Sequence, residues 1–241
     1  MKQSINQIEY LATQFRRDHL IGPLDPINCK RLIFSLNIFT LYRPMSENFS
    51  GMCLRNDDYR FMLINSNHKR GRQHFTIAHE IYHLFIQKDF VPHICNPGLP
   101  DQSDPVETAA NIFAACLLMP RDSIFSQIPE KELLDKTVTL PTILKLEQFF
   151  SVSHSAMLVR LDSLDLITKN QKEDYSQLLI KKKTIEYGYD TSIYESGNEG
   201  LVIGDFGART KELFESGKIS ESHYLDLMHS IGLDPTQNTN E

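Results

Sequence analysis

Residues 72–85 read RQHFTIAHEIYHLF, and positions 79–83 of this stretch form the pattern H-E-x-x-H. Its hydrophobic spacing predicts a helix over residues 72–87. His79 and His83 then stand about one turn apart on the same face, so their rings can converge on a zinc ion at roughly 2.0–2.1 Å per bond. Glu80 flanks that face, where it could take a proton from a zinc-bound water.

The apolar residues of this helix indicate which side faces the protein core. They are Ile77, Ile81, Leu84 and Phe85, and on a helical wheel they lie opposite the histidines. The core stripe therefore excludes His79 and His83, which we expect to face a different surface where a cleft could lie. The alternative, in which ordinary core partners satisfy both histidines, stays open at this stage.

A zinc peptidase site needs a third protein ligand and one open position for water. Asp89, His93 and Glu107 are the candidates. Ile86 stands where a sharp turn would use a glycine, so we expect the helix to continue and to carry Asp89 too far along its axis. His93 lies in the proline-rich stretch 91–103, predicted to be an irregular loop, and no pattern supports it. Glu107 is the preferred candidate.

Glu107 opens a helix predicted over residues 105–119, within the stretch DPVETAANIFAACLLMP. Helical spacing places Ala110, Asn111 and Ala114 on the same stripe as Glu107. The small alanines would allow a close approach to the histidine helix, and Asn111 is a candidate for supporting the metal ligands. Asp104 and Glu107 also fit a capping box, in which the glutamate folds back on its own helix and does not reach a metal.

The remaining patterns predict an α+β fold: a helical bundle that carries the H-E-x-x-H site, with a small antiparallel sheet built from residues 38–66. Further helices are expected at 5–18, 26–36 (with Asp25 as N-cap), 141–150 and 154–165, and strands at 38–43, 51–56, 60–65, 184–188 and 201–206. A helical hairpin that breaks at Gly217 follows. We expect a core over 1–125, a helical helix-turn-helix-like extension over 126–168 and a C-terminal region of unknown role over 169–241.

Composition limits the classes of partner. The chain has 241 residues, 41% of them hydrophobic, and a net charge of −6, which argues against a protein that binds nucleic acid electrostatically. No apolar run approaches the ~20 residues that span a bilayer. The N-terminus has no secretory signal pattern, and the four cysteines are scattered. We therefore expect a cytoplasmic protein with no membrane partner.

The helices at 141–150 and 154–165 have the order of a DNA-binding helix-turn-helix. The second carries Arg160 as its one full cation against Asp162 and Asp165. A recognition helix needs side chains that contact phosphates and base edges. A packing unit is therefore favoured, and direct nucleic-acid binding is not expected.

The two motifs together resemble the ImmA/IrrE family of zinc metallopeptidases. Residues 72–85 follow its pattern R-x-x-F-T-x-A-H-E-x-x-H, and residues 107–120 follow E-x-x-A-N-x-F-A-x-x-L-L-M-P. Residues 149–167 and 217–234 are similar to segments that follow the protease core in this family. The resemblance implies that His79, His83 and Glu107 bind Zn²⁺ and that Glu80 is the catalytic base.

Members of this family typically cleave a helix-turn-helix transcriptional repressor, in phage, mobile-element or stress regulation, and others are toxins paired with antitoxins. The resemblance thus implies a zinc-dependent endopeptidase that cuts such a repressor or an antitoxin in the cytoplasm. The alternative is a partner-binding module or toxin that keeps the zinc fold without proteolysis. Tyr82 replaces a residue that is usually glycine, and could crowd the cleft or donate a hydrogen bond to a substrate oxyanion. Arg72 could anchor the start of the histidine helix to a carboxylate.

Overall fold

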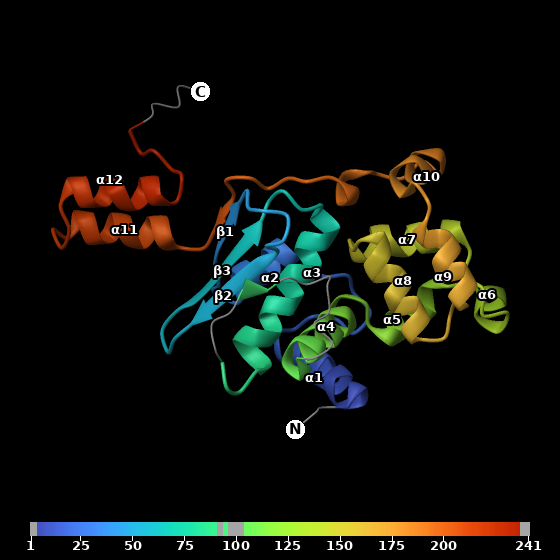
Figure 1. Cartoon of the computed structure of the whole chain (residues 1–241). Helices are drawn as coiled ribbons and strands as arrows, with labels where there is room; N and C mark the ends of the chain where they lie inside the picture. Colours follow the sequence, from blue (N-terminus) through green and yellow to red (C-terminus); the bar gives the residue numbers. More distant parts are fainter. Residues whose placement is uncertain (1–3, 91–93, 96–103, 237–241) are drawn as a thin grey trace.

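The computed structural model describes residues 4–90, 94–95 and 104–236, and combines helices with one sheet in an α+β fold (Figure 1). Its α-helices are α1 (Ile5–Asp18), α2 (Cys29–Ser35), α3 (Arg70–Ile81), α4 (Pro105–Leu118), α5 (Arg121–Gln127), α6 (Glu130–Leu134), α7 (Leu140–Phe150), α8 (His154–Ser163), α9 (Lys169–Ser176), α10 (Ile180–Glu186), α11 (Phe206–Glu215) and α12 (Glu221–Ser230). A π-helix, η1 (Tyr82–Ile86), continues α3, and a 3₁₀ turn, η2 (Ser192–Tyr194), follows α10. Within the described ranges, no helix combines the length and the apolar character that crossing a membrane requires.

The sheet consists of β1 (Phe39–Arg43), β2 (Gly51–Arg55), β3 (Arg60–Asn65), β4 (Ile94–Cys95) and β5 (Val202–Ile203), in the order β4-β2-β3-β1-β5. β2 and β3 pair antiparallel, as expected for this sheet, but β1 and β3 run parallel, with Leu41 opposite Leu63. The sheet is therefore mixed, and the prediction of an antiparallel sheet was wrong.

The connection between β1 and β2 explains the parallel pair. It carries the chain past one strand position, so that β3 returns into the gap beside β1. Asn65, fully buried at the end of β3, holds this connection: its amide nitrogen donates to the carbonyls of Ser46 and Phe49, and its oxygen accepts from the Met45 N–H at 3.0 Å. These are contacts between residues far apart in the sequence, which periodicity does not reveal.

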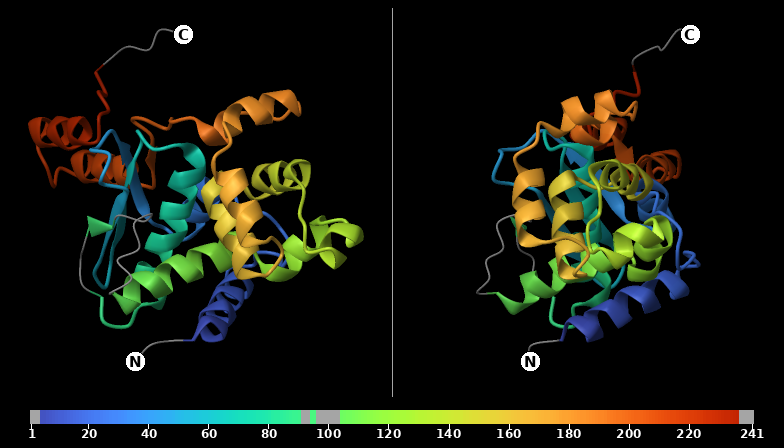
Figure 2. Two further views of the ribbon diagram at one scale, coloured as in Figure 1. Left: turned by 45° about the vertical axis from the view of Figure 1, so that its right-hand side comes forward. Right: turned by 90° about the vertical axis from the view of Figure 1, so that its right-hand side faces the viewer.

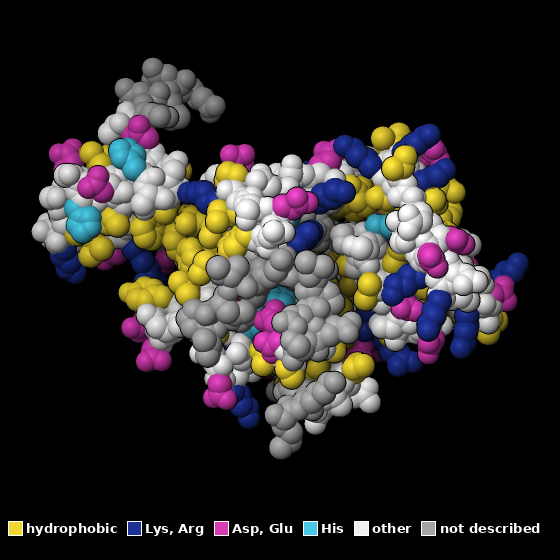
Figure 3. Space-filling model, in the orientation of Figure 1, with side chains coloured by type: hydrophobic (Ala, Val, Ile, Leu, Met, Phe, Trp, Pro, Cys, Tyr) yellow, Lys and Arg dark blue, Asp and Glu magenta, His cyan; other side chains and the backbone are white. Residues whose placement is uncertain are grey.

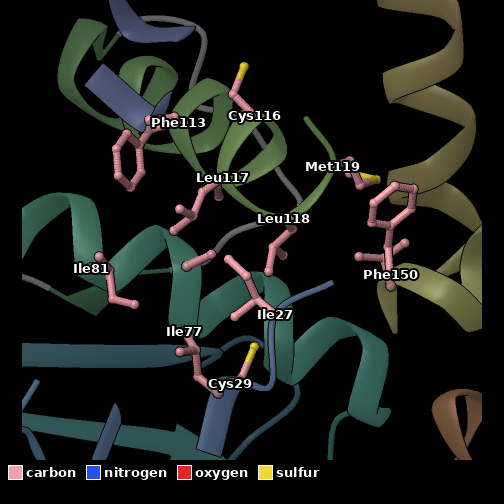
Figure 4. Close-up of a cluster of buried hydrophobic side chains, with 14 of the residues drawn as sticks. Ile27, Cys29, Ile77, Ile81, Phe113, Cys116, Leu117, Leu118, Met119 and Phe150 are labelled. Atoms are coloured by element: carbon pink, nitrogen blue, oxygen red, sulfur yellow. The ribbon is translucent and has the colours of Figure 1, made fainter. Parts of the chain in front are cut away.

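The core lies between α1, α3, α4 and the sheet. Ile77 and Ile81 of α3 belong to one buried cluster with Phe113 and Leu117 of α4, and all four are at most 1% exposed (Figure 4). Helices α5 to α10 gather on one side of α3, whereas the sheet and the hairpin of α11 and α12 lie on the other (Figure 2). α3 is consequently enclosed, and this fixes the position of the residues that it carries.

The segment between α10 and β5 crosses the start of α3 (Figure 1). Gln73 of α3 donates to the carbonyl of Gly197 at 3.0 Å and to that of His68 at 2.7 Å, and its oxygen accepts from the Asn198 amide at 2.8 Å. Arg70 adds a bond from its backbone N–H to the carbonyl of Glu195 at 2.8 Å. The C-terminal part of the chain thus holds the first turn of the histidine helix in place.

Several expected elements are confirmed and others are corrected. The helix at 5–18 and the strands at 39–43, 51–55 and 60–65 match their predictions closely, and the C-terminal hairpin turns at Gly217, whose φ is 70°. The second helix starts later than expected, capped by Asn28 and not by Asp25. Residues 184–188 were predicted as a strand, but most of this stretch belongs to helix α10. Of the loop predicted at 91–103, all but β4 lies outside the described residues.

The predicted division between residues 168 and 169 falls at the start of α9, which Thr168 caps. α9 packs on α8, since His154 bonds to the carbonyl of Tyr175 through Nε2 at 3.0 Å. The division into 1–125, 126–168 and 169–241 stays a prediction.

Arg160 of α8 contributes to packing. It is 5% exposed, and it pairs with Glu9 of α1 at 3.0 Å and donates to the carbonyl of Met119 at 3.1 Å. The main cation of the would-be recognition helix is therefore engaged inside the protein. At the surface, basic and acidic side chains are interspersed over the neighbouring helices α9 and α10 (Figure 3).

Candidate metal centre

His79, His83 and Glu107 come together between α3 and α4. The Nε2 atoms of the two histidines are 3.1 Å apart, and the Glu107 oxygens lie 3.3 Å from His79 Nε2 and 3.4 Å from His83 Nε2. In a tetrahedral zinc site with bonds of about 2.0–2.1 Å, ligand atoms stand roughly 3.3 Å from one another. The spacing of these three side chains fits the ligands of such an ion.

The start of α4 directs Glu107 toward the histidines. Asp104 caps the helix by accepting from the Val106 N–H at 2.7 Å, while the Glu107 carboxylate lies against both imidazoles. Asp104 therefore caps the helix, and Glu107 faces the two histidines. Ala110 and Ala114 are fully buried, as the close approach of α4 to α3 requires.

The second ring nitrogen of each histidine has an amide partner. His79 Nδ1 lies 3.0 Å from Asn111 Oδ1, and His83 Nδ1 lies 2.7 Å from Gln87 Oε1. An amide oxygen only accepts, so each Nδ1 carries the proton and each Nε2 keeps its lone pair. Both lone pairs are then available on the side of Glu107. The sequence analysis identified Asn111 but missed Gln87.

Both histidines are 0% exposed. They are therefore more deeply buried than side chains that line an open cleft. The side chain of Glu107 is 19% exposed and provides the contact with solvent. Asp89 does not join the group, but the expected reason was wrong: the helix ends with η1 at Ile86 and does not continue to carry Asp89 along its axis. His93 lies outside the described residues.

Glu80 is also fully buried, on the side of α3 that faces β2. A Cβ placed on Gly51 would come within 3.3 Å of Glu80 Oε1 and 2.6 Å of the Thr76 methyl group. Cys53 lies two residues further along β2, where the Glu80 carboxylate acts on its thiol. Burial raises the pKa of the Cys53 thiol far above its usual range, and the charge of Glu80 raises it further. A glycine and a neutral thiol thus leave room for this carboxylate.

Tyr82 and Arg72 were predicted to assist. Tyr82 is 5% exposed, its ring packs 5.6 Å from that of Phe113, and burial raises its pKa. Arg72 donates to the Ser50 hydroxyl at 2.8 Å; burial lowers its pKa, against a smaller opposite effect of Glu47. The hydrogen-bond partner of Arg72 is thus a hydroxyl, while the Glu47 carboxylate acts on it through its charge. The role of Tyr82 toward a substrate stays a prediction.

These features define a helical pair that brings two histidines and a glutamate to metal-ligand spacing. The sequence matches the IrrE N-terminal-like domain family, Peptidase_M78, over residues 35–162, just over half of the chain. The chain belongs to this family of metallopeptidases. No curated protein matches it.

Proposed function

We propose that this protein is a zinc-dependent endopeptidase, with His79, His83 and Glu107 as the metal ligands and Glu80 as the catalytic base. The observation that carries the proposal is the spacing of 3.1–3.4 Å among the three candidate ligands, together with their hydrogen-bonded imidazoles. The donor set of two imidazoles and one carboxylate is one that zinc takes in hydrolytic enzymes.

When bound at these ligands, zinc would polarise the scissile carbonyl and lower the pKa of water toward neutrality. The protein's own task is to move protons. Glu80 accepts a proton from the attacking water and delivers it to the amine nitrogen of the departing fragment. Its burial beside Gly51 and Cys53 keeps the carboxylate in one position, which reduces the reorganisation that proton transfer requires.

The proposed substrate is a cytoplasmic protein, a helix-turn-helix repressor or an antitoxin, cut at one or few sites. The support is membership of the family together with the deep burial of Glu80 and both histidines, which limits access to segments that can enter the site.

The test uses the wild type and Glu80→Gln. Each is co-expressed with the regulator encoded beside the gene, and fragments are mapped by mass spectrometry while bound zinc is measured in the purified protein. We expect one zinc per chain in both proteins and cleavage by the wild type alone. Cleavage by Glu80→Gln would refute the assigned base.

A second candidate is a partner-binding protein or toxin that keeps the metal but does not cut. The tight packing of Tyr82 beside His83, with ring centroids 5.6 Å apart, favours it, because the usual small residue would leave more room there. In that case the wild type and Glu80→Gln would both bind the same partner, and neither would cleave it.

A further inference from the structure

Gln87 links one candidate metal ligand to the end of its helix. Its Oε1 lies 2.7 Å from His83 Nδ1, and its Nε2 donates to the backbone carbonyl of Asp89 at 2.8 Å. The second bond fixes the orientation of the amide, because a carbonyl accepts only from the NH₂ end. The oxygen must then face His83, and the proton of that ring must be on Nδ1.

The π-helical turn η1 brings Gln87 to this place. The Gln87 N–H bonds to the carbonyl of Tyr82, five residues back, at 2.9 Å. The wider turn changes the angle at which residues after Ile86 leave the helix, and Gln87 itself has an extended backbone with φ −64° and ψ 123°. Such turns are frequent at functional sites. Here the turn sets an amide beside the second histidine.

Arg55 of β2 holds the backbone at the same point. Its guanidinium donates to the carbonyls of Leu84 at 2.9 Å, Gln87 at 2.8 Å and Lys88 at 3.2 Å. It also lies 4.9 Å from the centre of the Phe90 ring. Helix ends expose carbonyls that a cation stabilises. The strand next to Glu80 therefore also fixes the peptide that carries Gln87.

We propose that Gln87 is a positioning residue for His83: it holds the imidazole in the Nδ1–H form and aims the Nε2 lone pair at the metal position. This inference rests on the metal site of the proposed function. Partners of this kind affect metal affinity by about 10- to 100-fold when removed. Arg55 does not contact His83 directly in this scheme; it supports Gln87 by donating to its backbone carbonyl.

The test compares zinc affinity, by competition with a chromophoric chelator, in the wild type, Gln87→Leu and Gln87→Glu. We expect Gln87→Leu to bind zinc about 10- to 100-fold more weakly. Gln87→Glu keeps an acceptor for Nδ1–H and should restore most of the affinity. Equal affinity of the wild type and Gln87→Leu would overturn the inference.

Gln148→Leu is the matched control. Gln148 is also partly buried, and it donates to the carbonyl of Asp190 at 2.8 Å, remote in sequence from the metal ligands. Its loss removes a similar hydrogen bond and should leave zinc affinity unchanged. An equal drop in both leucine variants would show a general structural effect and contradict the positioning role.

A second readout is independent of metal, and its measurement on the wild type does not depend on whether the variants fold. Two-bond ¹H–¹⁵N correlations of the metal-free wild type report which ring nitrogen of His83 carries the proton. We expect Nδ1–H in the wild type, with more Nε2–H in Gln87→Leu. Nε2–H in the wild type would overturn the inference. If the wild type shows Nδ1–H but binds no zinc, the proposed function fails while the contact with Gln87 stands.

Discussion

Asn111 of α4 and His79 of α3 are joined by a hydrogen bond of 3.0 Å between Oδ1 and Nδ1. The bond ties the helix that carries the glutamate to the helix that carries both histidines, at the level of the candidate metal centre. It therefore sets the direction of one imidazole and the separation of the two helices together.

Asn111→Leu removes this acceptor at nearly constant volume. We expect zinc affinity to fall by about 10- to 100-fold, because His79 loses the partner that fixes its ring. Asn111→Asp keeps an acceptor and should bind zinc nearly as the wild type does. Chelator competition measures both, and unchanged affinity in Asn111→Leu would contradict the assignment.

Gly51→Ala tests the space around Glu80. The added Cβ would lie 2.6 Å from the Thr76 methyl carbon and 3.1 Å from the Leu63 carbonyl oxygen, so something must shift. We expect a loss of about 1–3 kcal/mol in the free energy of unfolding, measured by urea denaturation, and slower cleavage as Glu80 is displaced. Adding Thr76→Ser removes the closest atom and should recover part of the loss.

The control for this prediction is Gly207→Ala in α11. The nearest atom to its Cβ is the terminal carbon of Met228 at 3.6 Å, an ordinary contact. Since alanine favours a helix over glycine, this variant should be at least as stable as the wild type. Equal stability of Gly51→Ala and the wild type would show that the contact is readily relieved.

Stability should depend on pH through His154. Burial alone lowers its pKa, but the hydrogen bond and charge of Glu147, 2.5 Å away, outweigh this and raise the pKa above the usual value of 6.5. A raised pKa in the folded protein adds stability that is complete below pH 6.5 and is lost as pH rises through the folded pKa. In urea denaturation, the wild type should have a higher free energy of unfolding than His154→Gln, and this difference should shrink as pH rises above 6.5.

The pKa of His74 is shifted in the opposite direction to that of His154, so its effect on stability should have the opposite pH dependence. Burial lowers its pKa, against a smaller rise from its bond to the Ser151 carbonyl. Its contribution is present above pH 6.5 and is lost as pH falls through the folded value. The difference in the free energy of unfolding between the wild type and His74→Gln should therefore shrink as pH falls below 6.5. A difference that does not vary with pH in either pair would contradict these directions.

Arg160→Gln tests whether α8 is a packing element. The change removes a charged hydrogen bond to Glu9 and should lower the free energy of unfolding by about 1.5–3 kcal/mol. Arg209→Gln, at the exposed pair with Asp205, should leave stability unchanged. Neither should alter retention on duplex DNA at low salt, and weaker retention of Arg160→Gln alone would indicate that α8 contacts nucleic acid.

Local patterns predicted several of the helices, among them those at 5–18 and 105–119, and the ligand candidates. They did not predict the arrangement that depends on distant contacts. The pair β1 and β3 is parallel because of the connection that Asn65 holds, which leaves no periodic signal. Residues 184–188 have strand-forming side chains, yet Thr184 is fully buried within α10 and bonds back to the carbonyl of Ile180 at 2.9 Å. Tertiary packing overrides propensity there.

The candidate site was predictable to the extent that it depends on helical spacing. His79, His83, Glu107 and Asn111 follow from two such helices, once α4 is packed against α3. Gln87 stands four residues after His83, a spacing visible in the sequence. The contact of its side chain with His83 depends on the π-helical turn, however, and a regular helix was predicted there.

The most direct test of the metal centre is a crystal structure of zinc-loaded Glu80→Gln, with anomalous scattering recorded at the zinc edge. We predict one strong peak between α3 and α4, bound by Nε2 of His79, Nε2 of His83 and a carboxylate oxygen of Glu107, at roughly 2.0–2.2 Å. A peak held by other residues, or none at this position with Glu107 turned away, would contradict the account.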